Sequence, residues 1–140
     1  MKNISILTLL LVLSDQATKF LATKYLSISK NTGIAFGIPI PQELLIIANI
    51  ALLIVLFYFI KKELDLSHRL SQVLTAGVLA GGISNLGDRL YHGYVIDFIA
   101  VPYWPTFNLA DIYITVGILL LIIFYGRLKN TREQSGRAAS

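Results

Sequence analysis

The stretch Phe107–Gly126, FNLADIYITVGILLLIIFYG, begins with an amide and a carboxyl group and continues as a long apolar run. Asn108 and Asp111 are three residues apart, so a helix places them on one face. Such groups are costly at the edge of a bilayer. One explanation is helix capping, because Asn is a preferred N-cap and an acidic residue in the first turn complements the helix dipole. The other explanation is a functional site.

The composition is that of a membrane protein. The chain has 140 residues, 55% hydrophobic and 14% charged, and a mean hydropathy of +0.68; these values are typical of a multi-span protein. Its basic residues flank apolar runs and are not interleaved with aromatic residues, which argues against nucleic-acid binding. The absence of cysteine excludes disulfides and a thiol nucleophile. His68 and His92 have no ligand-like spacing, so we expect no metal and no other cofactor.

Four segments have the length and composition of membrane-spanning helices: 4–26, 43–60, 70–90 and 107–125. The third is glycine-rich and less apolar. The first resembles a secretory signal peptide, but no clear small-residue cleavage site follows it and further spans do, so we expect it to be retained. The sequence predicts an all-α polytopic membrane protein, with residues 1–126 as one four-span domain and 127–140 as a polar cytoplasmic tail. The end of the tail, NTREQSGRAAS (residues 130–140), is expected to be disordered.

The distribution of positive charge predicts the orientation. With four spans, eight of the twelve basic residues fall on one side: Lys2, Lys61, Lys62, Arg69, Arg127, Lys129, Arg132 and Arg137. By the positive-inside rule both termini are then cytoplasmic. Four aromatic residues fall at the outer interface, where amphipathic rings are favoured: Tyr91, Tyr94, Tyr103 and Trp104.

Two outer segments, 27–42 and 91–106, are rich in glycine, proline, β-branched and aromatic residues. This composition favours strands and turns over helices. Extended backbone cannot face lipid with its polar groups unsatisfied. We therefore expect a small extracytoplasmic subdomain of strands and loops that pair with one another or pack on the helix ends.

Further polar residues lie in the outer halves of the spans. In the first span, Asp15 and Lys19 are four residues apart and are expected to form a structural, charge-neutralising pair. In the third, Asn85, Asp88 and Arg89 lie within one turn, either as polar contacts between helices or as part of a site. Three glycines of this span are expected to let neighbouring helices approach closely: Gly81, Gly82 and Gly87.

Asp97 favours a functional explanation. It lies between Ile96 and Phe98 in a predicted strand, without an adjacent cation, which is a poor position for a lone structural charge. Like Asp111, it falls on the outer side. Two carboxyl groups brought together in low dielectric share a proton. One can then act as a base on water while the other donates a proton, as in aspartic proteases; Asn108 would position its neighbours.

Read in order, DQATK, NTGIAFG, GGISNLGDR, VIDF and FNLAD resemble the motifs of the lipoprotein signal peptidases, or signal peptidase II, from Asp15 to Asp111. The resemblance implies an aspartic endopeptidase of the bacterial inner membrane. It implies cleavage of diacylglyceryl-modified prolipoproteins before the lipidated cysteine, near the outer face of the membrane and without a cofactor. The expected partners are the lipid-modified prolipoprotein and membrane lipids, and a monomer is expected.

Residue by residue, the resemblance carries the catalytic role to Asp97 and Asp111. Four residues match positions that bind substrate or support the aspartates: Asn31, Asn85, Arg89 and Asn108. Three match positions expected to support folding rather than chemistry: Asp15, Lys19 and Asp88. Ser84 stands where the family often has glycine, a small change. The compact segment from Asp97 to Asp111 leaves the size of any outer flap open.

Two other functions were weighed. A proton-coupled transporter or small channel also uses intramembrane aspartates, but usually near the midplane on broken helices. A serine–lysine peptidase would use Ser14 and Lys19. Because these two residues are five positions apart, they point about 140° apart around a helix, so they are not expected to meet.

Overall fold

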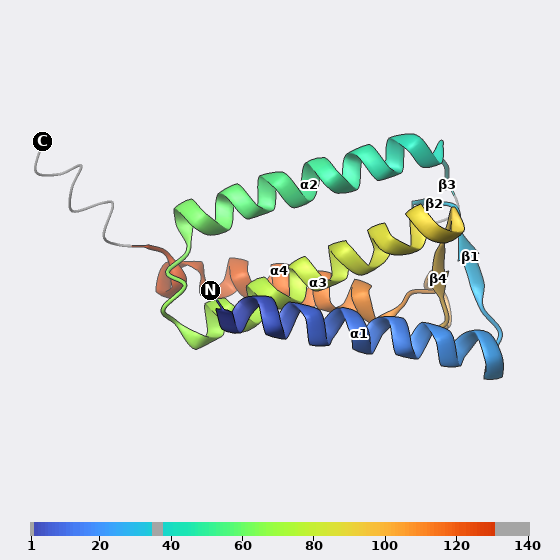
Figure 1. Ribbon diagram of the computed structural model, residues 1–140, viewed down its shortest axis with the longest axis horizontal. Helices are drawn as coiled ribbons and strands as arrows, with labels where there is room; N and C mark the ends of the chain where they lie inside the picture. The colour runs from blue at the N-terminus through green and yellow to red at the C-terminus, as the bar shows by residue number, and fades with distance from the viewer. Residues whose placement is uncertain (1, 35–37, 131–140) are drawn as a thin grey trace, which may run out of the picture.

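The computed structural model describes residues 2–34 and 38–130, in which four long helices dominate. Each helix overlaps one of the predicted apolar segments: α1 (Lys2–Tyr25), α2 (Gln42–Glu63), α3 (Arg69–His92) and α4 (Leu109–Leu128). They run side by side, with the short strands at one end and the start of α1 at the other (Figure 1). Residues 131–140 of the predicted tail, and 35–37 of the NTGIAFG motif, lie outside the described residues.

Three of these helices, α1, α2 and α4, are long and apolar enough to cross a membrane. The predicted polytopic, mostly helical membrane protein is therefore confirmed. The helix α3 is as long as α1, but it does not reach the same hydropathy. It packs against α1, α2 and α4, so most of its surface meets protein.

The distribution of polarity is the reverse of that in a water-soluble protein. Large apolar side chains such as Leu52, Phe57 and Ile122 are exposed. The largest fully buried side chains are all polar or charged: Lys19, Asn108, Thr75, Asp15, Asp88, Asp97, Ser71 and Ser84. Apolar groups on the outside and polar groups inside suit a protein whose solvent is lipid.

Glycines allow α3 to approach its neighbours closely. A Cβ at Gly81 would overlap the backbone oxygen of Ala110 and the side chain of Ile114 in α4, and one at Gly82 would lie 2.7 Å from Leu53 in α2. These two predictions are confirmed. The prediction for Gly87 is wrong: it faces open space, because it lies on the exposed side of α3.

The two outer segments form strands that pair, as expected. Strand β1 (Ser29–Asn31) of the first outer segment runs antiparallel to β4 (Val95–Asp97) of the second outer segment, with Ser29 opposite Asp97. A second short pair joins β2 (Gly33–Ile34) and β3 (Ile38–Pro39). This pairing fixes Asp97 at the strand end of the helix bundle (Figure 1).

Two local features direct the chain around β4. Gly93 ends α3 in the left-handed conformation, at φ 76°, and its N–H bonds to the oxygen of Arg89, so the chain can turn sharply into the strand. Beyond β4, Ile99 pairs antiparallel with Phe107. The second pairing closes the loop between Asp97 and the start of α4, which brings the two predicted catalytic segments together.

Candidate active site

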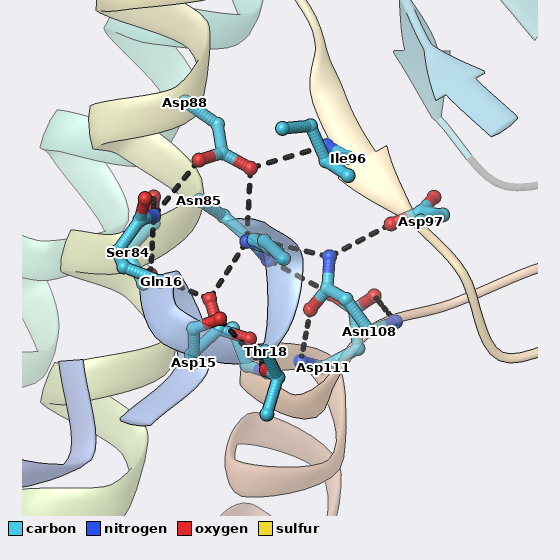
Figure 2. Close-up of polar contacts among 12 residues, drawn as sticks. Asp15, Gln16, Thr18, Ser84, Asn85, Asp88, Ile96, Asp97, Asn108 and Asp111 are labelled. Carbon is cyan, nitrogen blue, oxygen red and sulfur yellow. Dashed lines mark hydrogen bonds and ion pairs between the residues drawn. The ribbon is translucent and has the colours of Figure 1, made fainter. Parts of the chain in front are cut away.

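The polar side chains converge at the strand end of the bundle, from three helices and two strands, and Figure 2 shows those from α1, α3, β4 and the start of α4. Asp15 and Lys19 come from α1, Asn85 and Asp88 from α3, Asn31 from β1, Asp97 from β4, and Asn108 and Asp111 from the start of α4. The structure therefore brings together eight of the nine site residues singled out from the sequence. Arg89, the ninth, has a different environment, described below.

Lys19 is the centre of a buried ion cluster. Its Nζ lies 2.8 Å from Oδ2 of Asp15 and 2.9 Å from Oδ2 of Asp88, and all three side chains are at most 1% exposed. The predicted contact between Asp15 and Lys19 is present. The second carboxylate was not anticipated, because Asp88 is 69 positions away in the sequence and reaches Lys19 only when α3 packs on α1.

The two carboxylates of this cluster also hold other elements in place. Asp15 Oδ1 accepts a 2.8 Å hydrogen bond from the backbone N–H of Ala110 at the start of α4. Asp88 Oδ2 accepts one from the backbone N–H of Ile96 in β4, at 3.1 Å. The cluster thus ties α1 and α3 to both segments that carry the predicted catalytic aspartates.

Two contributors to this cluster were missed from the sequence. Gln16 donates through Nε2 to Asp88 Oδ1 at 2.8 Å and to Ser84 Oγ at 2.9 Å. The Ser84 hydroxyl donates to Asp15 Oδ2 at 2.6 Å. Gln16 belongs to the DQATK motif, and this membership is the feature of the sequence that could have identified it as a site residue. Ser84 was treated only as a small replacement for glycine, yet its hydroxyl is one of the donors to the cluster.

Asn108 and Asp111 do form a capping box at the start of α4. The Asp111 N–H donates to Asn108 Oδ1 at 2.9 Å, and the Asn108 N–H donates to Asp111 Oδ2 at 3.1 Å. The capping explanation is therefore confirmed, but the cap uses only one polar atom of each side chain, Oδ1 of Asn108 and Oδ2 of Asp111. The side-chain NH₂ group of Asn108 donates to Asp97 Oδ1 at 2.7 Å, so this residue links the two aspartates.

Three asparagine amides donate to the two aspartates, and a donor on each amide oxygen fixes this orientation. Asn31 accepts from the Gly33 N–H and donates to Asp97 Oδ2. Asn108 accepts from the Asp111 N–H and donates to Asp97 Oδ1. Asn85 accepts from Lys19 Nζ and donates to Asp111 Oδ1. Because ammonium and backbone N–H groups only donate, each amide must direct its NH₂ group at a carboxyl.

Asp97 is only 1% exposed. Burial, helped by the nearby negative charge of Asp111, raises its pKa from 3.8 to about 6, against the lowering effect of the hydrogen bonds from Asn31 and Asn108. A carboxyl group with this pKa can both hold and release a proton near neutral pH. That property is what acid–base chemistry requires.

Arg89 makes none of these hydrogen bonds, although it is close enough for its charge to interact with those of Asp111, Asp97 and Asp88. Its Nε is buried without a hydrogen-bond partner. Together with Asn85, Arg89 lines a cavity of about 300 Å³ between α2, α3 and α4, whose other walls are mostly apolar, for example Leu52 and Ile114. Asn85 therefore lies between the two aspartates' network and a mostly apolar cavity.

The serine–lysine alternative does not fit this geometry. Ser14 Oγ donates to the backbone oxygen of Leu11 and lies 2.8 Å from the hydroxyl of Tyr113. The Lys19 ammonium instead has Asp15, Asp88 and Asn85 as partners. All three of its donors are thus used within the ion cluster and by Asn85.

The family model described as Signal peptidase (SPase) II matches residues 7–126. The chain belongs to the signal peptidase II family. This peptidase is 34% identical over 146 residues to the lipoprotein signal peptidase of Borrelia hermsii, an alignment covering 82% of this chain and 84% of that one. It is also 34% identical over 142 residues to that of Clostridium tetani, with 85% and 89% covered. With that of Chlamydia trachomatis it shares 37% identity over 110 residues, 75% of this chain and 64% of the relative.

Solved structures agree with this assignment. One bacterial membrane enzyme aligns with a TM-score of 0.77 at 28% identity, covering 88% of this chain and 87% of that one. Another aligns with a TM-score of 0.76 at the same identity, covering 88% and 92%. Its sequence therefore places the chain in a protease family, and its fold is similar to that of bacterial membrane enzymes.

Proposed function

We propose that Asp97 and Asp111 are the catalytic pair with which this peptidase removes signal peptides from lipid-modified prolipoproteins. The observation that carries the proposal is Asn108, which donates its side-chain amide to Asp97 and its backbone N–H to Asp111. Because one residue bonds to both carboxyl groups, it holds them at a fixed distance from each other. One of the two is buried and the other half-buried, and the family is one of aspartic peptidases.

In this mechanism Asp97 carries the shared proton, in keeping with its raised pKa of about 6. Asp111 takes a proton from water, and the water oxygen bonds to the carbonyl carbon of the scissile peptide while the π electron pair of the carbonyl moves onto its oxygen; the double bond forms again when the leaving nitrogen departs. Asp97 then gives its proton to the leaving nitrogen as the C–N bond breaks. Transfer of the proton from Asp111 to Asp97 restores the starting state.

The cavity beside Asn85 and Arg89 is the proposed place for the apolar part of the substrate. Its walls come from α2, α3 and α4 and are mostly apolar, which suits acyl chains or a hydrophobic signal sequence arriving sideways from the bilayer. Arg89 supplies a positive charge at a polar part of the wall. A substrate that stays in the membrane thus reaches the pair without passing through water.

The proposed topology has four spans, with the 1–126 domain in the bacterial inner membrane as a monomer among lipids. The tail, 127–140, and the N-terminus are cytoplasmic, and the aspartates lie near the outer face. The packing of α3 against three apolar helices supports its assignment as a span. A helix shielded from lipid on most sides does not need an apolar surface.

The test is cleavage of a diacylglyceryl-modified precursor by purified protein. Asp97→Asn and Asp111→Asn keep the side-chain shape but remove the acid–base group, so each should lower kcat by about 10²–10⁴-fold or more. Asp65→Asn is the matched control, because Asp65 lies beyond α2 at the other end of the bundle, and it should keep wild-type activity. An unmodified precursor should be cleaved poorly by all four proteins.

Thermal unfolding in detergent shows whether each variant is folded. Substantial turnover by either folded dyad variant would rule out the assignment of Asp97 and Asp111. Equal cleavage of modified and unmodified precursor by the wild type would instead contradict the substrate class.

A further inference from the structure

Each amide around the aspartates has one donor within 3.2 Å of its oxygen that does not come from another amide, and two of these donors are backbone groups, the N–H of Gly33 and the N–H of Asp111. The third is the side chain of Lys19. We propose that Lys19 is a positioning residue for the peptidase reaction: its ammonium group fixes the Asn85 amide so that the NH₂ group points at Asp111. The inference rests on the proposed role of Asp111.

The contacts of Lys19 exceed what charge neutralisation requires. Its Nζ uses two donors on Asp15 and Asp88 and places the third 3.0 Å from Asn85 Oδ1. Two carboxylates already outnumber the single ammonium, so the contact with Asn85 adds nothing to the balance of charge. It does determine which end of that amide faces the ion cluster.

The rest of the path follows from hydrogen-bond chemistry. With Oδ1 held by Lys19, Asn85 Nδ2 lies 2.8 Å from Asp111 Oδ1 and must donate to it. Without the ammonium, the remaining donor to Asn85 Oδ1 is the Asn108 amide, at a longer 3.2 Å. A neutral donor holds an acceptor less firmly than a charged one. The Asn85 amide can then turn its oxygen toward Asp111, where two acceptors repel and displace the carboxylate.

Replacing Lys19 alone would leave two buried carboxylates unpaired, so the test uses an Asp88→Asn background. The wild-type cluster has one positive and two negative charges. Lys19→Met with Asp88→Asn leaves one carboxylate and therefore the same net charge. Relative both to the wild type, whose net cluster charge it shares, and to Asp88→Asn alone, this double variant should show a kcat about 10–100-fold lower, with KM unchanged. Lys19→Arg in the same background keeps N–H donors and should recover most of the kcat.

A double-mutant cycle shows whether Lys19 acts through Asn85. In the Asp88→Asn background, Asn85→Ala should lower kcat as much as Lys19→Met does. Adding Lys19→Met to Asn85→Ala should cause no further loss. All rates are measured below the melting temperature of each variant. A merely structural Lys19 would lower melting temperatures with kcat intact, or give losses that multiply, and either result would overturn the inference.

Asn85→Ala in the otherwise wild-type chain decides the matter if the lysine variants do not fold, because it leaves both ion pairs of Lys19 intact. A loss of kcat at unchanged KM supports the inference, whereas wild-type kcat overturns it. The proposed function fails differently, through activity retained by Asp97→Asn or Asp111→Asn. Loss of activity in those two variants together with full activity of Asn85→Ala would leave the dyad standing and reject Lys19 as its positioning residue.

Discussion

At the scale of single residues, Asp97 shows two opposed effects on one carboxyl group. Amide donors reach both of its oxygens, from Asn31 at 2.9 Å and from Asn108 at 2.7 Å, and these bonds favour the ionised form. Removal from water favours the protonated form and is the larger effect, so the pKa rises to about 6. The donors therefore fix the carboxyl in place without committing it to the ionised state.

This raised pKa predicts how stability depends on pH. In the unfolded chain Asp97 loses its proton near pH 3.8, whereas in the folded protein it does so near pH 6. The folded protein therefore holds the Asp97 proton more tightly than the unfolded chain does. The resulting contribution to the free energy of unfolding is fully present below pH 3.8 and is lost as pH rises through 6. The full difference would correspond to roughly 3 kcal/mol, and solvent screening makes the contribution smaller. Thermal unfolding in detergent from pH 4 to 7.5 should show the wild type losing stability relative to Asp97→Asn; parallel curves would contradict the prediction.

The residues of the site could be predicted better than their contacts. Asp97 and Asp111 were identified because an unpaired carboxyl group beside apolar residues is costly, and this cost is visible in the sequence. The contact of Lys19 with Asp88, and those of Gln16 with α3, cross between helices. Spacing along one helix predicts neighbours three and four positions away, so it identified Asp15 as a partner of Lys19 and not Asp88.

At the scale of elements, α3 determines how closely the site is assembled. It carries Asn85 and Asp88, and its contact with α4 passes through Gly81, where a Cβ would overlap the backbone oxygen of Ala110. The N–H of the same Ala110 donates to Asp15. Close packing at Gly81 and the position of the first turn of α4 are therefore coupled, one turn of α3 away from Asn85.

Two alanine substitutions in α3 should consequently have opposite effects. Gly81→Ala forces α3 and α4 apart and should cost about 1–3 kcal/mol in stability, with a lower kcat because the first turn of α4 shifts. Gly87→Ala is the matched control, since its Cβ meets nothing within 4 Å, and it should stabilise the protein by up to about 1 kcal/mol. Melting temperatures and cleavage rates check both. Equal effects of the two substitutions would mean that contact at Gly81 does not limit the packing.

The helices could be predicted from the sequence because long apolar runs are a direct signal, and all four predicted segments are helical. The outer strands could be predicted only as segments. Their pairing, Ser29 opposite Asp97, joins residues 68 positions apart, and strands of two or three residues carry too little pattern to define a register. Gly87 was assigned to a helix contact because composition does not reveal which face of a central helix is covered.

At the scale of the whole molecule, the buried polar cluster and the apolar core lie toward different ends of the helix bundle. The ion cluster and the aspartates lie at the strand end, because Asp88 bonds to Ile96 of β4 and Asp97 belongs to β4. The strands lie at one end of the bundle, and the connection from α2 to α3 lies at the other (Figure 1). That second end has its own apolar core, formed by Ile60, Leu64, Leu74, Val78, Leu121 and Leu128. The backbone N–H of Asp65 also donates there to the oxygen of Leu128. The bundle is therefore held by apolar contacts at one end and by ion pairs and hydrogen bonds at the end that carries the candidate site.

The proposed topology can be tested directly, because the chain has no cysteine and any introduced cysteine is the only one. Ser67 and Tyr103 are both exposed and lie on either side of α3 along the chain. In intact cells, a membrane-impermeant maleimide should label Tyr103→Cys, at the strand end, and should label Ser67→Cys only after permeabilisation. Labelling of both in intact cells, or of neither, would mean that α3 does not cross the membrane. Labelling of Ser67→Cys alone would invert the orientation and place the aspartates near the cytoplasmic face, where a precursor already carried across the membrane could not reach them.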